Sequence, residues 1–275
     1  GYNNLEYSNQ STEGEYTSLA VGFSKEWAEQ DLFLSVGYAQ VEALVGNPMN
    51  SSVGYSSWTY FNDVDRDNPS LGVSQFEIPE RMSAYMRWSP TLFADLESRF
   101  SLTWSHNKGR PYSFVFNGYP DMRGDALDGD GDNMLLYVPT GPNDPNVVFA
   151  DGFDTDAFFA TMDSYGFERG AFVDRGQHYS PWYARLNFKF EQMLPGLRTN
   201  DQSSVFFTIR NLGNFLNDEW GIYNFQSDHD IVDGQALNDG VDQYYIYRNF
   251  RGLRDKGRSG RGSSYLVKIG FSYRF

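Results

Sequence analysis

The 275-residue chain has no cysteine, which excludes a disulfide framework and thiol chemistry. It also lacks any apolar run near the roughly 18 residues that would predict a membrane-spanning helix. Basic residues are few, 22 against 36 acidic ones, so the formal net charge is -14 and nucleic acid is not an expected partner. These absences leave one class of membrane protein open, because a barrel strand needs only about 9–11 alternating residues.

What the chain does contain is alternation of apolar and polar residues at a period of two, which predicts strands with two unlike faces. The clearest case is the last eleven residues, where Tyr265, Val267, Ile269, Phe271, Tyr273 and Phe275 alternate with mostly polar neighbours. The pattern predicts an all-β protein, either a soluble sandwich or a membrane barrel. About seven segments show it: 15–27, 32–44, 80–89, 96–108, 180–192, 203–213 and 263–275.

The connections between these segments alternate between short and long, which favours the barrel. Outer-membrane barrels have short turns at the periplasmic rim and long loops outside the cell, whereas sandwiches have short loops at both ends. The short connections are 28–31, 90–95 and 193–202. The expected extracellular loops are 1–14, 45–79, 109–179 and 214–262.

The strand count then places the chain within a larger barrel. An antiparallel transmembrane β-barrel of a bacterium has an even number of strands, and seven do not close it. We therefore expect residues 1–275 to be the C-terminal part of an outer-membrane β-barrel, with the strand before segment 15–27 outside this chain. Gln243–Phe250 also has strand character, but counting it would leave the C-terminus on the wrong side of the membrane, so we assign it to an extended outer loop.

The two faces of the predicted strands differ as a barrel wall requires. The apolar set would face lipid, with Trp27, Trp88, Trp104, Trp182, Tyr265 and Tyr273 near strand ends, where aromatic girdles lie. The polar set would face the lumen, and its charged members are mostly basic. They are Arg81, Arg87, Arg99, Arg185, Lys189, Arg210, Lys268 and Arg274.

The order of several segments resembles the C-terminal barrel region of TonB-dependent receptors, specifically the Oar-like group. The matching pieces are Leu135–Pro139 (LLYVP), Pro181–Phe188 (PWYARLNF), Ile209–Gly221 (IRNLGNFLNDEWG) and Tyr265–Phe275. The resemblance implies a barrel of about 22 strands, filled by an N-terminal plug and driven by the TonB complex. The plug and the segment that contacts TonB lie outside this chain.

The function that the resemblance implies is transport of a bulky extracellular cargo, such as a peptide, protein or glycan, across the outer membrane of a Gram-negative bacterium. Its partners would be outer-membrane lipid, the N-terminal barrel strands, the plug and the TonB complex. The alternative is a passive porin or a surface-adhesion barrel without a plug. An outer-membrane hydrolase would need His106 or His178 beside a serine and an aspartate, and no motif supports one, so we expect no enzyme and no required cofactor.

Two loop segments share the pattern Asp-x-Asp-x-Asp-Asn, in which alternate carboxylates can converge on a hard cation. One is 63–68. The other is 128–133, where glycines between Asp128, Asp130 and Asp132 let the backbone curl. The second predicts a structural Ca²⁺ with these three aspartates as ligands; a solvated acidic loop is the alternative for both segments. Neither segment is an EF-hand, because position six is asparagine and no glutamate stands at position twelve.

The expected outer loops are unusually aromatic. Their phenylalanine, tyrosine and tryptophan residues include Trp58, Phe114, Phe116, Phe158 and Tyr247. Solvated loops do not need so many large apolar side chains. Either the loops pack into an extracellular cap or their aromatic residues line a binding surface, and the two can coexist.

Overall fold

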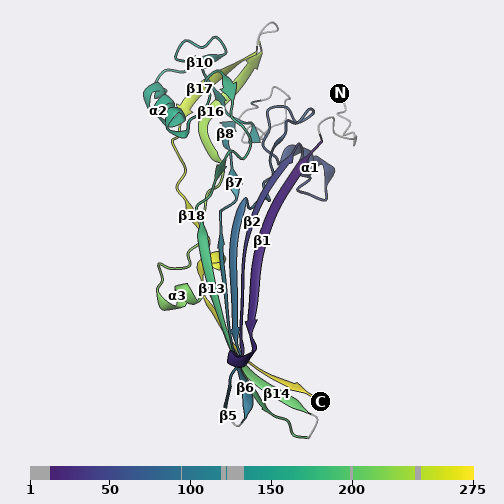
Figure 1. Cartoon of the computed structure of the whole chain (residues 1–275). Helices are drawn as coiled ribbons and strands as arrows, with labels where there is room; N and C mark the ends of the chain where they lie inside the picture. Colours follow the sequence, from purple (N-terminus) through teal and green to yellow (C-terminus); the bar gives the residue numbers. More distant parts are fainter. Residues whose placement is uncertain (1–12, 94, 119–121, 123–132, 199–200, 239–242) are drawn as a thin grey trace.

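The computed structural model describes residues 13–93, 95–118, 122, 133–198, 201–238 and 243–275. One tall antiparallel sheet forms the body of the molecule, and the long connections gather at one end of it (Figure 1). We call this sheet the main sheet. We call the gathered residues 46–79, 108–182 and 217–259, as far as they are described, the cap.

The main sheet contains seven long strands that pair in sequence order, each antiparallel to the next. They agree with the predicted segments to within about three residues at each end. Short β3 (Gly72–Val73) adds to β2, and β5 (Thr91–Phe93) adds to β6. The long strands are β1 (Glu15–Trp27), β2 (Leu32–Val45), β4 (Glu80–Trp88), β6 (Leu96–Asn107), β13 (Tyr183–Pro195), β14 (Gln202–Arg210) and β19 (Leu266–Arg274).

The strand register brings every apolar set onto the same face of the main sheet. A one-residue slip in any pair would turn that strand's apolar set to the other face, so the register of the whole sheet is fixed consistently. The resulting apolar face is open: Val21, Phe23 and Ile269 are each more than half exposed. One row across the sheet is Trp27, Leu32, Trp88, Phe100, Phe190, Phe207 and Ile269.

The opposite, polar face carries the eight predicted cations, and several of them pair with carboxylates on the same face. Arg87 lies 3.1 Å from Glu26 across β2. The Glu191 carboxylate lies 2.8 Å from the Lys189 ammonium on the same strand and 3.8 Å from the Arg99 guanidinium on β6. The polar face is therefore a mixed, partly neutralised ion network rather than a purely basic one.

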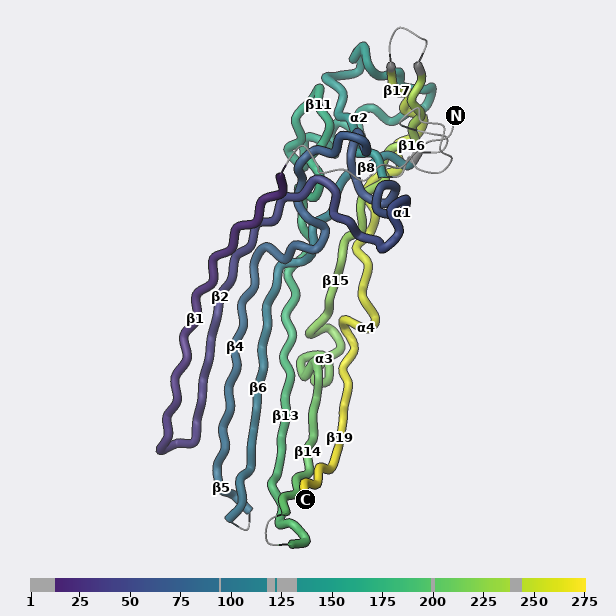
Figure 2. Tube along the Cα trace, turned by 90° about the vertical axis from the view of Figure 1, so that its right-hand side faces the viewer, coloured from purple at the N-terminus to yellow at the C-terminus, as the bar shows by residue number. Residues whose placement is uncertain are grey.

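Short turns join the strands at one end of the main sheet, and the long connections leave from the other (Figure 2). The first turn is the short helix η1 (Ala28–Gln30), closed by Asp31 in the left-handed conformation at φ 51°. The asymmetry that the sequence predicted is thus present in the fold.

The cap contains a second sheet, assembled from strands that lie far apart in the sequence. Its order is β10 (Val147–Phe149), β17 (Gln243–Phe250), β16 (His229–Asn238) and β8 (Phe114–Gly118). Helix α2 (Thr155–Tyr165) packs beside β17 and begins at Asp154, whose carboxylate accepts a hydrogen bond from the Ala157 amide. Gln243–Phe250 is therefore a strand, and it belongs to the cap rather than to the main sheet.

Smaller elements complete the cap. They are α1 (Gly54–Thr59), β7 (Pro111–Tyr112), β9 (Tyr137–Val138), β11 (Ala171–Phe172), β12 (His178–Tyr179), β15 (Asn224–Phe225) and β18 (Gly257–Arg258). Two further short helices, α3 (Leu212–Leu216) and α4 (Gly260–Ser263), lie lower, beside the main sheet (Figure 2). Within the described residues, no helix is long and apolar enough to span a membrane.

The hydrophobic core of the described chain lies in the cap and not against the main sheet. Aromatic rings dominate it, and Tyr247 at its centre donates a hydrogen bond to the Tyr137 carbonyl oxygen. Packing of the loop aromatics into a cap is therefore confirmed. The most deeply buried members include Phe114, Val115, Phe116, Met122, Met134, Leu136, Val138, Phe158, Met162, Ile231, Val232 and Tyr247.

Candidate functional site

The predicted calcium ligands Asp128, Asp130 and Asp132 lie outside the described residues. The other acidic segment, 63–68, is described, and its carboxylates have partners within the protein. Asp65 accepts hydrogen bonds from the amides of Asp67 and Asn68, and Asp67 accepts one from the Trp58 indole at 3.0 Å. Across the described part of the chain, no three acidic or histidine side chains form a group suited to a metal ion.

Asp63 is the buried carboxylate of that segment, and its cationic partner is a guanidinium of the protein. Its carboxylate lies 3.2 Å from Arg175 and accepts amide hydrogen bonds from Val64 and Ser70. Burial raises the pKa of Asp63, while Arg175 and the amides act to lower it. The structure thus gives Asp63 a structural role, joining one long connection to another.

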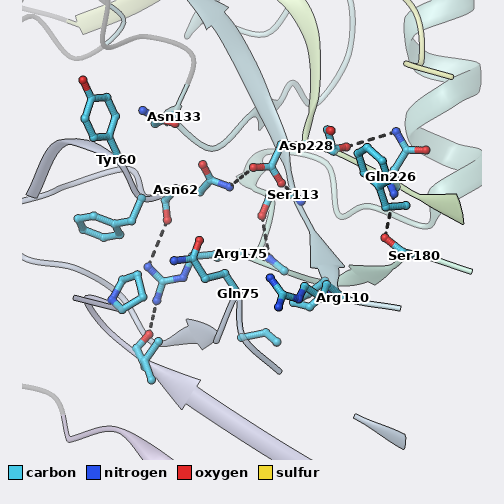
Figure 3. A pocket seen from close by; sticks show the side chains of 18 of the residues that line it. Tyr60, Asn62, Gln75, Arg110, Ser113, Asn133, Arg175, Ser180, Gln226 and Asp228 are labelled. Carbon is cyan, nitrogen blue, oxygen red and sulfur yellow. Dashed lines mark hydrogen bonds between the residues drawn. The ribbon is translucent and has the colours of Figure 1, made fainter. Parts of the chain in front are cut away.

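Beside this ion pair lies a cavity of about 420 Å³ between the cap and the end of the main sheet (Figure 3). All three long connections between the strands contribute to its wall, together with Val45 at the end of β2. Its polar lining consists of Asn62, Gln75, Arg110, Ser113, Asn133, Arg175, Ser180, Gln226, Ser227 and Asp228.

Arg175 holds one side of the cavity in place. Its guanidinium donates hydrogen bonds to the carbonyl oxygens of Asn62 at 3.2 Å, Ser70 at 3.0 Å and Val45. It also binds Asp63, so this buried side chain connects the end of β2 with residues 62–63 and with Ser70 in the connection 46–79. The fixed fork of a guanidinium suits such a multiple contact, which a lysine ammonium would make less well.

Asp228 forms the acidic part of the cavity. One carboxylate oxygen accepts a hydrogen bond from the Asn62 amide at 2.7 Å, and the other accepts one from the Ser113 backbone at 2.6 Å. Burial raises the pKa of Asp228, and these two donors act against that rise. Each oxygen still has a lone pair to offer, since a carboxylate has about four acceptor sites.

Behind the cavity wall, His178 and His229 lie in a cluster of aromatic rings. His229 is almost fully buried, its Nδ1 accepts a hydrogen bond from the Arg254 amide, and burial lowers its pKa to about 4. His178 packs against Tyr165 and Phe167. His106 lies apart on the main sheet, between Trp104 and Trp182. No histidine in the described ranges is hydrogen-bonded to a serine hydroxyl or a carboxylate.

The sequence did not reveal this cavity. Its polar residues are single asparagines, glutamines and serines spread from Asn62 to Asp228, with no shared spacing. Only the aromatic richness of the loops hinted that they would pack together. In comparisons with known proteins, the chain matches no family model, no curated protein and no solved structure.

Proposed function

We propose that the main sheet is part of the wall of an outer-membrane β-barrel and that the cap lies outside the cell. The observation that carries this proposal is the apolar face, which runs over seven antiparallel strands and is open to the surroundings over most of its extent. Contiguous exposed apolar surface of this extent marks an interaction with lipid or with another protein. Strands that alternate between a lipid face and a polar face are the signature of such a wall.

The two edges of the main sheet support a wall larger than seven strands. Among the described residues, β1 pairs only with β2, and β19 pairs only with β14. Lipid offers no hydrogen-bond partners, so both edges need further strands in the membrane. A barrel of about 22 strands, as in the TonB-dependent receptors that the sequence resembles, would supply them.

We further propose that this wall belongs to a TonB-dependent transporter that takes a bulky cargo through a plugged barrel. The large packed cap supports this assignment, because a transporter must hold its cargo at the outer surface. A passive porin or adhesion barrel is the alternative, and the ion network on the polar face suits a channel lining too. A plug-forming domain encoded in the same gene would support transport, whereas a gene without one would support the porin.

Membrane topology gives a direct test, because the chain has no cysteine of its own. A Tyr55→Cys variant, in exposed helix α1, should react with a membrane-impermeant maleimide on intact cells. A Glu29→Cys variant, in the first short turn, should react only after the outer membrane is permeabilised. Labelling of both positions on intact cells, or of neither, would refute the proposed orientation.

A further inference from the structure

Four polar side chains of the cavity have hydrogen-bonding capacity to spare. The Ser113 hydroxyl accepts a bond from the Gly176 amide, and the Ser180 hydroxyl accepts one from the Gln226 amide, which leaves each hydroxyl proton to donate. Both serines are almost fully buried, so these donors can only point to a group inside the protein or in the cavity. Asp228 supplies acceptor sites, and exposed Gln75 supplies both a donor and an acceptor.

The charge of the cavity is close to balanced. Arg175 is already paired with Asp63, which leaves exposed Arg110 and the carboxylate of Asp228 as the charged groups that face the space. Figure 3 shows Arg110 and Asp228 lining the same cavity. The Asp228 carboxylate would repel a polyanion and the Arg110 guanidinium would repel a polycation, so the cavity favours a ligand without net charge.

Aromatic rings border this polar floor. The Phe225 ring packs closely on the backbone of Gly257, where an added Cβ would lie 2.6 Å from the ring, and yet 36% of the residue is exposed. Packing on Gly257 therefore fixes the position of the Phe225 ring while part of the residue stays accessible to a ligand. Tyr60 contributes a second ring, more exposed than the first.

We propose that this cavity binds a neutral saccharide unit. The cargo of the proposed transporter would then be a saccharide that binds at the cap. The inference rests on the proposed function, because it takes the cap to be the surface that meets cargo. Each sugar hydroxyl both donates and accepts, as the mixed floor of serines, Gln75 and Asp228 requires. The apolar face of a pyranose ring suits an aromatic side chain, and about 420 Å³ lies within the size range of small-ligand pockets.

A neutral peptide is the competing occupant of this cavity. The lining also contains aliphatic side chains, among them Val45, Val73 and Pro111, which the side chains of a peptide would contact. Peptide binding is a measurable outcome, and it would contradict the proposal.

The test uses the whole protein, purified in detergent and shown to be folded by its heat-modifiable mobility. Binding of this protein is measured to an array of neutral oligosaccharides, built from hexoses and N-acetylhexosamines, and to a library of blocked, uncharged tripeptides. We expect binding to saccharides and not to the tripeptides. For the best saccharide, Gln75→Ala should weaken affinity by about 2- to 10-fold, and Asp228→Asn by about 10-fold or more.

Tyr60→Ala should also weaken binding, whereas Tyr55→Ala should not, because Tyr55 is a similarly exposed ring outside the cavity. Gln75 and Tyr60 are exposed, so their variants should fold even if the Asp228 variant does not. Folded protein that binds none of the saccharides, or whose affinity is unchanged by Gln75→Ala and Tyr60→Ala, overturns the inference. The topology experiment would then still decide the proposed function by itself.

Discussion

At the scale of single residues, Arg175 joins parts of the chain that are far apart in the sequence. It is buried, and its partners are Asp63 and the carbonyl oxygens of Val45, Asn62 and Ser70. Removing one member of a buried ion pair leaves the other as an uncompensated charge, which commonly costs about 3–5 kcal/mol. The stability of the cap near the main sheet should therefore depend strongly on this side chain.

We predict that Arg175→Ala destabilises the cap by about 3 kcal/mol or more. Protease cleavage in 46–79 should become faster while the strands of the main sheet stay protected. Arg169→Ala is the matched control, because Arg169 pairs with Asp163 at 2.7 Å on the surface, where such a pair contributes about 0–1 kcal/mol. Equal cleavage rates for the two variants would contradict the structural role of Arg175.

His229 gives the cap a pH dependence with a defined sign. Burial lowers its folded pKa to about 4, while an exposed histidine titrates near pH 6.5. Above about pH 6.5 the ring is neutral in both states, so its contribution to stability is fully present. As the pH falls toward 4, the unfolded chain takes up a proton that the folded cap excludes, and roughly 3 kcal/mol is lost. Asp63 and Asp228, whose pKa values are raised, act in the opposite direction.

The prediction therefore compares the pH dependence of cap stability in the parent protein with that in a His229 variant. His229→Asn keeps an acceptor for the Arg254 amide but does not titrate, so its cap should lose less stability between pH 6.5 and 4 than the parent does. Hydrogen exchange of cap amides measures this slope. His106→Asn, on the main sheet, should retain the parent slope. Parallel curves for the parent and the His229 variant would show that His229 does not set the pH dependence.

At the scale of elements, β6 shows how alternation and register together make two faces. Leu102 lies on the apolar face between Met86 and Phe188, and the next residue, Thr103, lies on the polar face between Tyr85 and Asn187. These neighbours in sequence would meet different solvents in the proposed barrel. A charge on the lipid face costs about 2–4 kcal/mol near the bilayer midplane, while lumen substitutions are tolerated.

We predict that Leu102→Arg lowers the amount of folded protein in the outer membrane and that Thr103→Arg does not. Immunoblots of unheated and heated membrane fractions would compare the two variants in the same strand. If both variants accumulate equally, the apolar face does not meet lipid.

At the scale of the whole molecule, the distribution of burial is unusual. A soluble sheet protein buries one face of its sheet in a core, but here the large core belongs to the cap. The main sheet contributes few buried apolar side chains, of which Ile209 is one. Its stability in the proposed setting would come from lipid and from strands beyond its two edges.

Residues 1–275 expressed alone should therefore aggregate when refolded in detergent. The edges of β1 and β19 leave backbone groups without partners, at a cost of several kcal/mol for each group buried in an apolar phase. Semi-native gels and size-exclusion chromatography would report the outcome. A closed monomer with heat-modifiable mobility would contradict the need for further strands.

The sequence by itself determined the main sheet. Alternation at a period of two depends only on local geometry, so the strand positions, the two faces and the short and long connections could all be read from it. Gln243–Phe250 shows the limit of that reading: its pattern indicates a strand, but only long-range packing decides that it joins β16 and β10.

The cap and its cavity were decided by tertiary structure alone. Asp63 and Arg175 are 112 positions apart, and Asn62 and Asp228 are 166 apart, and no local period connects them. The acidic segment 63–68 had the spacing of a cation site, but burial next to Arg175 gave Asp63 a guanidinium partner instead. Contacts of this kind depend on how separate loops pack together, and a pattern within one segment carries no information about its future neighbours.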